Sequence, residues 1–212
     1  MPIEAEKKKP GRPKGQKDAR ESLLKTASAL FAERGADAVS VREIAHEAGV
    51  SPAMVNYYFA DKQGLMRAVL ERGLDGLLAV IEGMGEVKGQ SFTRQFIDGY
   101  LSALFEDPSL PHLMVREVLS GNETYREVIR ERFTNKALAL VPSRIGNDVQ
   151  NRYLRNDLDP RLMMLSLLGM CIFPFLSKPL VGARLGLQFD DAFKEQLIEH
   201  TTRLFEEGAS PK

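Results

Sequence analysis

The sequence predicts an all-α protein in which a small N-terminal domain of three helices precedes a larger helical domain. Apolar residues recur at spacings of three and four, which marks one face of a helix, and no segment shows the alternation of a half-buried strand. The chain has 212 residues, of which 43% are hydrophobic and 27% charged, so it can bury a sizeable core. Glycines and prolines divide the helical pattern into separate helices.

The first helix of the small domain is predicted to begin at Ala19 and to end before Gly35. Glycine commonly ends a helix because it adopts the left-handed conformation without strain. The predicted apolar face of this helix comprises Leu23, Ala27, Leu30 and Phe31.

Two shorter helices follow, and their spacing predicts a helix-turn-helix rather than an ordinary helical hairpin. Ser40 followed by Glu43 is a capping-box pattern for the second helix. Ser51 followed by Pro52 predicts a cap and a first-turn proline for the third. Helices that cross at a tight turn need a small residue, a turn glycine and a branched apolar residue. Ala45, Gly49 and Val55 occupy these three places.

Three consecutive aromatic residues, Tyr57, Tyr58 and Phe59, end the third helix. Neighbours along a helix point in directions about 100° apart, so the three rings cannot all face the core. Phe59 is expected to point inward and at least one tyrosine to face outward. Asp61 is then expected to cap a fourth helix, with Lys62 in its first turn.

Residues 19–66 resemble the DNA-binding domain of the TetR family of bacterial transcriptional regulators. The resemblance covers "ARESLLKTASALFAERGADAVSVREIAHEAGVSPAMVNYYFADKQGLM". Tyr57, Tyr58, Phe59 and Lys62 fit the family pattern. Asn56 stands where the family usually has tyrosine, and because Asn-Tyr-x-Phe variants occur in the family, we expect Asn56 to alter sequence specificity and not membership.

The resemblance implies double-stranded DNA as a partner. The start of the third helix is expected to read base edges in the major groove, while Tyr57 and Tyr58 contact phosphates and sugars. Lys62 is expected to hold a phosphate, and the start of the second helix to contact the opposite wall of the groove. The expected DNA contacts, including one arginine of the N-terminal arm, are Arg12, Ser40, Arg42, Ser51, Pro52, Ala53, Met54, Asn56, Tyr57, Tyr58 and Lys62.

The N-terminal arm is basic although the whole chain has a formal net charge of zero. Its first 20 residues hold seven Lys or Arg against three Asp or Glu, so the rest of the chain carries a surplus of four negative charges. "KKKPGRPKGQK" contains Gly11-Arg12-Pro13, which resembles the core of an AT-hook that enters a minor groove. Residues 1–18 are therefore expected to form a flexible DNA-binding arm; a solubilising tail is the alternative.

A connecting helix is expected over residues 67–88 and the larger domain over residues 89–212, because glycines at 83, 85 and 89 mark a break. Helical patterns then run through "SFTRQFIDGYLSALFED" and "PSLPHLMVREVLSG". Asn122 is expected to cap the next helix, and Asp159 followed by Pro160 to begin a long apolar one. The last helix is expected over about residues 190–207.

The segment Leu162–Ser177 is uncharged and contains Pro174. It is shorter than the roughly 20 residues of a membrane span, so a buried helix and no membrane contact are expected. In the family, the last two major helices form a homodimer interface. The segment agrees, because it is apolar on nearly all sides, as expected for a helix that meets its own domain on one face and a partner subunit on another.

The resemblance also implies a small-molecule effector pocket in the larger domain. Aromatic, methionine and charged residues on its helices are the candidates, with ordinary core packing as the alternative for each. They are Phe96, Tyr100, His112, Met114, Arg116, Glu117, Tyr125 and Phe133.

These features predict a cytoplasmic, ligand-responsive repressor that binds a palindromic operator as a homodimer and is released by a small molecule. An architectural protein of A/T-rich DNA is the alternative. An enzyme is not expected, because His46, His112 and His200 are far apart and no nucleophile or phosphate-loop motif is present. The single cysteine, Cys171, excludes an internal disulfide and a cysteine-based metal cluster, and no cofactor is expected.

Overall fold

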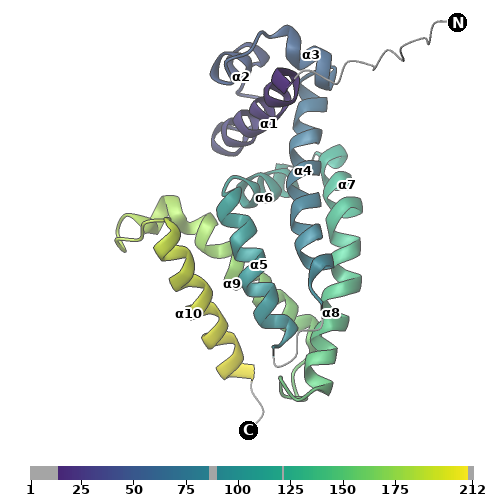
Figure 1. Ribbon diagram of the computed structural model, residues 1–212, viewed down its shortest axis with the longest axis vertical. Coiled ribbons are helices and arrows are strands. Elements are labelled where there is room, and N and C mark those ends of the chain that lie inside the picture. The colour runs from purple at the N-terminus through teal and green to yellow at the C-terminus, as the bar shows by residue number, and fades with distance from the viewer. Residues whose placement is uncertain (1–13, 86–89, 121, 210–212) are drawn as a thin grey trace, which may run out of the picture.

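The computed structural model describes residues 14–85, 90–120 and 122–209, which form helices and no strand. Figure 1 shows α1, α2 and α3 gathered at one end, which we call the head together with the first turns of α4. The remaining helices form the body. The elements are α1 (Lys14–Arg34), α2 (Val41–Glu47), α3 (Ala53–Phe59), α4 (Lys62–Gly83), α5 (Phe92–Glu106), α6 (Leu110–Ser120), α7 (Glu123–Ile129), the π-helical η1 (Arg130–Thr134), α8 (Asn135–Gln150), α9 (Pro160–Ser177), the π-helical η2 (Lys178–Gly182) and α10 (Asp191–Ala209).

The head has the predicted helix-turn-helix packing. Ala45 of α2 and Val55 of α3 are fully buried where the two helices cross. Gly49 between them has φ +68°, and Gly35 after α1 has φ +84°, so both glycines take the left-handed conformation expected at these turns. Leu23, Ala27 and Phe31 of α1 are fully buried against this pair, and Leu30 packs at the edge of the core.

Two boundaries in the head differ from the prediction. The first helix begins at Lys14, so residues 14–18 are helical and the predicted flexible arm of residues 1–18 is too long. Residues 1–13, including Arg12, lie outside the described residues. The third helix begins at Ala53 with Pro52 in the cap position at φ −57°, one residue later than expected.

The turn from α3 to α4 is unusually tight. Ala60 adopts φ +68°, a region that non-glycine residues rarely occupy. Asp61 then caps α4 as predicted, with Oδ1 accepting a hydrogen bond from the Gly64 amide at 2.7 Å. A Cβ atom added to Gly64 would lie 2.0 Å from the carbonyl oxygen of Phe59, so the turn leaves no room for a side chain there.

α4 joins the head to the body as one continuous helix. Its buried residues run from Leu65, within the head, to Ile81 near its far end. In Figure 1 it passes from the head into the body beside α7. α4 therefore links the body directly to the end of the helix-turn-helix.

A buried carboxylate fastens the start of α5 to the end of α8. Asp148 is 4% exposed and accepts hydrogen bonds from the Phe92 amide at 2.9 Å and the Thr93 amide at 3.0 Å. These amides belong to the first turn of a helix, where backbone N–H groups lack partners within the helix. The interaction joins residues 55 and 56 positions apart, and sequence spacing gave no sign of it.

The predicted local caps of the body are confirmed. Asn122 accepts from the Tyr125 amide at 3.4 Å, and Asp159 accepts from the Arg161 amide at 2.8 Å. The side chain of Arg161 also donates to Asp159, which lowers the pKa of that carboxyl to about 2.

α9 is buried by its own chain on one side only. One face packs into the body through Met163, Met164, Leu167, Cys171 and Phe175. The opposite face exposes Leu162, Leu165 and Phe173, each by more than 60% of its surface. The helix therefore has two apolar faces, of which one is covered by its own chain.

Candidate nucleic-acid interface

The beginning of α3 and one of its faces point away from the core. Ser51, Pro52, Ala53, Asn56 and Tyr57 are exposed, whereas Val55 and Phe59 on the opposite face are buried. Tyr57 keeps 65% of its surface accessible. A short helix with one buried face and a polar, aromatic outer face can enter a major groove without disturbing its own packing.

Of the three consecutive aromatic residues, Phe59 points into the core, as predicted. Its ring is 8% exposed, with the Arg20 guanidinium 5.4 Å from the ring centroid. Tyr58 is half-buried and packs against the core, and its ring meets that of Tyr57 edge to face at 4.9 Å. Tyr57 is therefore supported on one side by a packed neighbour.

Met54 is less available than expected for a base contact, because it is partly buried and packs against the core of the head. It follows two exposed residues, Pro52 and Ala53, at the beginning of α3. The outer surface of this helix start is thus formed mainly by small side chains. Such a surface allows the helix backbone to come close to a groove.

The start of α2 presents Ser40 and Arg42, both exposed. Ser40 Oγ accepts a hydrogen bond from the Glu43 amide at 3.2 Å, as the capping box predicts. The reciprocal half is absent, because the Glu43 carboxylate pairs with Arg34, and that hydrogen bond lowers the pKa of Glu43. The hydroxyl of Ser40 still has its proton to donate.

Lys62 has partners other than the phosphate expected from the sequence. Its Nζ donates to the carbonyl oxygen of Ala36 at 2.8 Å and to that of Val39 at 3.2 Å. Both acceptors belong to the loop between α1 and α2. In this structure the partly buried ammonium group of Lys62 therefore bonds to the head itself.

Comparison with known proteins identifies the family. A model of bacterial regulatory proteins of the tetR family matches residues 23–69, and a model of the C-terminal domain of the HTH-type transcriptional dual regulator CecR matches residues 90–208, more than half of the chain. The HTH-type transcriptional repressor KstR2 of Mycobacterium tuberculosis is 30% identical over 156 residues, covering 70% of this chain and 76% of that protein. The chain belongs to the TetR family.

Further comparisons agree with this TetR-family assignment. The HTH-type transcriptional regulator RutR of Escherichia coli K12 is 25% identical over 198 residues, which cover 91% of each chain. The solved structure of KstR2 has a TM-score of 0.70 at 20% identity, covering 91% of this chain and 95% of that one. The fatty acid degradation regulator FadR of Bacillus halodurans has a TM-score of 0.66 at 18% identity, with 95% and 98% covered. The protein is thus a ligand-responsive transcriptional regulator with the fold of this family.

The eight residues predicted for the effector pocket of this TetR regulator fall into two groups in the described part of the chain. Phe96 and Tyr100 of α5 are fully buried, with their rings stacked 4.9 Å apart. Burial raises the pKa of Tyr100. His112 Nε2 lies 3.1 Å from the carbonyl oxygen of Phe175 and Phe133 is 6% exposed, while Met114 is partly buried. These five residues are part of the packed interior of the body or lie at its edge.

The other three candidates meet at the seam between head and body. A cavity of about 610 Å³ is lined there by Arg116, Glu117 and Tyr125, together with Lys62 and residues 34–38 of the head. Arg116 Nη2 lies 3.5 Å from the carbonyl oxygen of Glu33. Burial and the carboxylate of Glu117 raise the pKa of Tyr125. The sequence singled out these residues for their chemistry, but local periodicity could not show that they face the α1–α2 loop.

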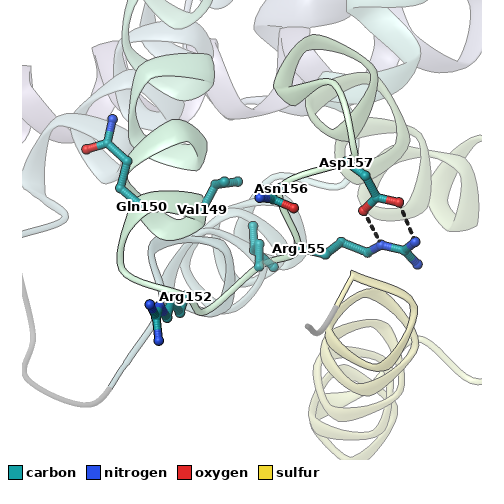
Figure 2. Close-up of a pocket in the computed structure, with 7 residues that line it drawn as sticks. Val149, Gln150, Arg152, Arg155, Asn156 and Asp157 are labelled. Carbon is teal, nitrogen blue, oxygen red and sulfur yellow. Dashed lines mark hydrogen bonds and ion pairs between the residues drawn. The ribbon is translucent and has the colours of Figure 1, made fainter. Parts of the chain in front are cut away.

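A second cavity, of about 710 Å³, lies at the loop that follows α8 (Figure 2). Arg155 and Asp157 form a bidentate pair across one side of it, with Nε–Oδ1 and Nη2–Oδ2 distances of 2.5 Å each. None of the residues predicted to bind DNA or effector lines this cavity.

Proposed function

We propose that this TetR-family regulator is a repressor that binds a palindromic operator as a homodimer and is released by a small molecule. The exposed face of α3, with Asn56 and Tyr57 on a rigidly packed helix-turn-helix, is the observation that carries the proposal. Asn56 can pair with an adenine edge through two hydrogen bonds, and Tyr57 can donate to a phosphate. Arg42 and the proton of Ser40 contact the opposite wall of the groove.

The uncovered face of α9 supports the homodimer. Leu162, Leu165 and Phe173 of α9 and Leu204 of α10 are all more than half exposed. Large apolar residues exposed together on one helix face, as Leu162, Leu165 and Phe173 are, mark an interaction surface. A two-fold partner would cover them with the same residues of its own chain and would place two α3 helices about 34–36 Å apart, on successive major grooves.

A membrane is a weaker explanation for the same face. Residues Pro160–Gly182 are long and apolar enough to cross a bilayer. However, Leu167, Cys171 and Phe175 of this segment are at most 1% exposed and belong to the body core. Insertion of α9 into lipid would remove them from that core, whereas a partner subunit leaves them in place.

The effector would act through the two helices that contact both parts of the molecule. α4 continues from the head into the body, and α6 contacts the end of α1 through Arg116. The interior candidates Phe96 and Tyr100 are closely packed, so a ligand that binds beside them has to part the body helices. Release from DNA follows if the ligand prefers a dimer in which the two α3 helices no longer match the operator spacing.

Substitutions on α3 test the reading helix. Asn56→Ala is expected to reduce discrimination at one base pair by about 1–3 kcal/mol, because its hydrogen bonds go to a base edge. Tyr57→Ala is expected to weaken binding to all sequences alike, because its contact is with the backbone. Binding constants on operator DNA selected from a random pool, on single-base variants and on scrambled DNA distinguish the two effects.

Tyr153→Ala is the matched control, because Tyr153 is a partly exposed tyrosine of the body. It should bind like wild type. If both α3 variants also bind like wild type while their thermal unfolding is unchanged, α3 does not read DNA.

A further inference from the structure

We infer that Lys62 is a positioning residue, which holds the α1–α2 loop and thereby sets the start of α2, with Ser40 and Arg42, at the angle from which α2 faces DNA. The inference rests on the proposed function for its DNA-binding consequence. Its structural part concerns the free protein and can be tested without DNA.

The ammonium group of Lys62 donates hydrogen bonds to the α1–α2 loop. Two of its three N–H donors are used, by the carbonyl oxygens of Ala36 at 2.8 Å and Val39 at 3.2 Å. The lysine is the first residue of α4, and Asp61 before it caps that helix. Lys62 therefore connects the beginning of α4 with a loop 23 to 26 positions earlier in the chain.

Cationic side chains hold three carbonyl groups of the loop: Lys62 bonds to those of Ala36 and Val39, and Arg34 Nη2 donates to that of Ala38 at 3.1 Å. α1 ends at Arg34, and Gly35 then reverses the chain at φ +84°. Ala36 and Val39 lie beyond the end of α1, so their carbonyl groups need partners outside that helix. Lys62 bonds to both. Within the loop, the amide of Val39 also donates to the Ala36 oxygen, at 3.4 Å.

The carbonyl group of Val39, which accepts from Lys62, lies directly before α2. Val39 is 1% exposed and is followed directly by Ser40, the N-cap of α2. The Ser40 hydroxyl accepts from the Glu43 amide at 3.2 Å, and its carbonyl accepts from the Ile44 amide at 3.1 Å. A shift of Val39 would therefore move the first turn of α2, including Arg42, as a unit.

The salt dependence of DNA affinity distinguishes a Lys62 that contacts a phosphate from a Lys62 that only positions α2. To reach a phosphate, the ammonium group would have to leave both carbonyls. Each phosphate contact contributes about −0.9 to the slope of log affinity against log salt, because it releases condensed counterions. A residue that only orients α2 changes affinity and leaves this slope as it is.

The test compares Lys62→Met with wild type. Lys62→Met keeps the length of the apolar stem but removes the charge and the donors. In the DNA-free protein, we expect amide hydrogen exchange of Glu43 and Ile44 to become about 10-fold faster, because these amides bond to Ser40. On operator DNA, we expect affinity to fall about 10-fold with an unchanged salt slope.

Two further variants calibrate the result. Lys62→Arg can donate to two carbonyls and should restore both exchange and affinity. Arg42→Ala, which removes an exposed cation of α2, should make the slope shallower by about 0.9 and leave exchange unchanged. If Lys62→Met does not fold, Lys62→Leu takes its place, because it also removes the charge and all three donors.

Unchanged exchange together with a slope shallower by about 0.9 in the Lys62→Met protein would overturn the inference and make Lys62 a phosphate ligand. Failure of the Arg variant to restore exchange would also overturn it. If the wild-type protein selects no operator, the proposed function fails, while the exchange experiment still decides whether Lys62 holds the loop.

Discussion

Gly64→Ala is expected to lower the free energy of unfolding by about 3 kcal/mol and to abolish operator binding. The added Cβ would lie 2.0 Å from the carbonyl oxygen of Phe59, which is a backbone atom and cannot rotate away. Relief requires the α3–α4 turn to open, and Ala60 in that turn already adopts φ +68°. Opening the turn would also displace Phe59, whose ring packs α3 into the head.

Gly76→Ala is the matched control in the same helix. A Cβ added to Gly76 meets nothing within 4 Å, so alanine there should raise the free energy of unfolding by about 0.5–1 kcal/mol through its higher helix propensity. Urea unfolding of the two variants and wild type measures the difference. Equal stability of the Gly64 and Gly76 variants would mean that the turn is not as tight as described.

Replacement of both Leu165 and Phe173 by arginine is expected to convert a dimer into a folded monomer. The two side chains are exposed by 63% and 67%, so the charges cost the isolated subunit little but would be buried in a two-fold interface. Operator affinity should fall at least about 100-fold, because two linked half-site contacts become one. Sedimentation velocity and operator binding are the measurements.

Leu119→Arg serves as the control, since Leu119 of α6 is 77% exposed and does not belong to the α9 face. It should remain dimeric. Leu168, in the middle of α9, is a poor site for this test, because it packs partly against the body core and a charge there would also unfold the subunit. A double variant that stays dimeric and binds the operator normally would place the interface elsewhere.

Local signals in the sequence predicted the helix-turn-helix and most of the caps. Ser40, Asn122 and Asp159 each accept a hydrogen bond from an amide two or three residues later, so their role depends on a short stretch of chain alone. The crossing of α2 and α3 is also local, because Ala45 and Val55 are only ten residues apart. Such local features can be predicted from the sequence without knowledge of the rest of the fold.

Interactions between distant segments could not be predicted in this way. The Asp148 carboxylate caps α5 from α8, Lys62 holds a loop of the head from α4, and Arg116 contacts the end of α1 from the body. In each case the partner lies 23 or more positions away along the chain, beyond the range of a local sequence pattern. Lys62 was predicted to hold a phosphate because it fits the family pattern in the first turn of α4, and Arg116 was a candidate for the effector pocket with ordinary core packing as the alternative.

The residues predicted to bind the effector could not be separated into core and pocket residues from their spacing. Aromatic and methionine residues at helical spacing are typical both of a core and of a ligand pocket. Phe96 and Tyr100 became fully buried core residues, whereas Glu117 and Tyr125 line the seam. Helical periodicity gives the face of a residue on its own helix but not which other helix lies opposite.

The central claim, that a dimer reads a palindrome with two copies of α3, is tested most directly by selecting bound DNA from a random pool with the full-length protein. We expect enrichment of an inverted repeat whose half-sites lie about one helical turn of DNA apart, or a multiple of it. Repetition of the selection with Asn56→Ala should give the same repeat with relaxed preference at one symmetric pair of positions. Enrichment of A/T-rich sequences without any inverted repeat would contradict the account and favour an architectural DNA-binding protein.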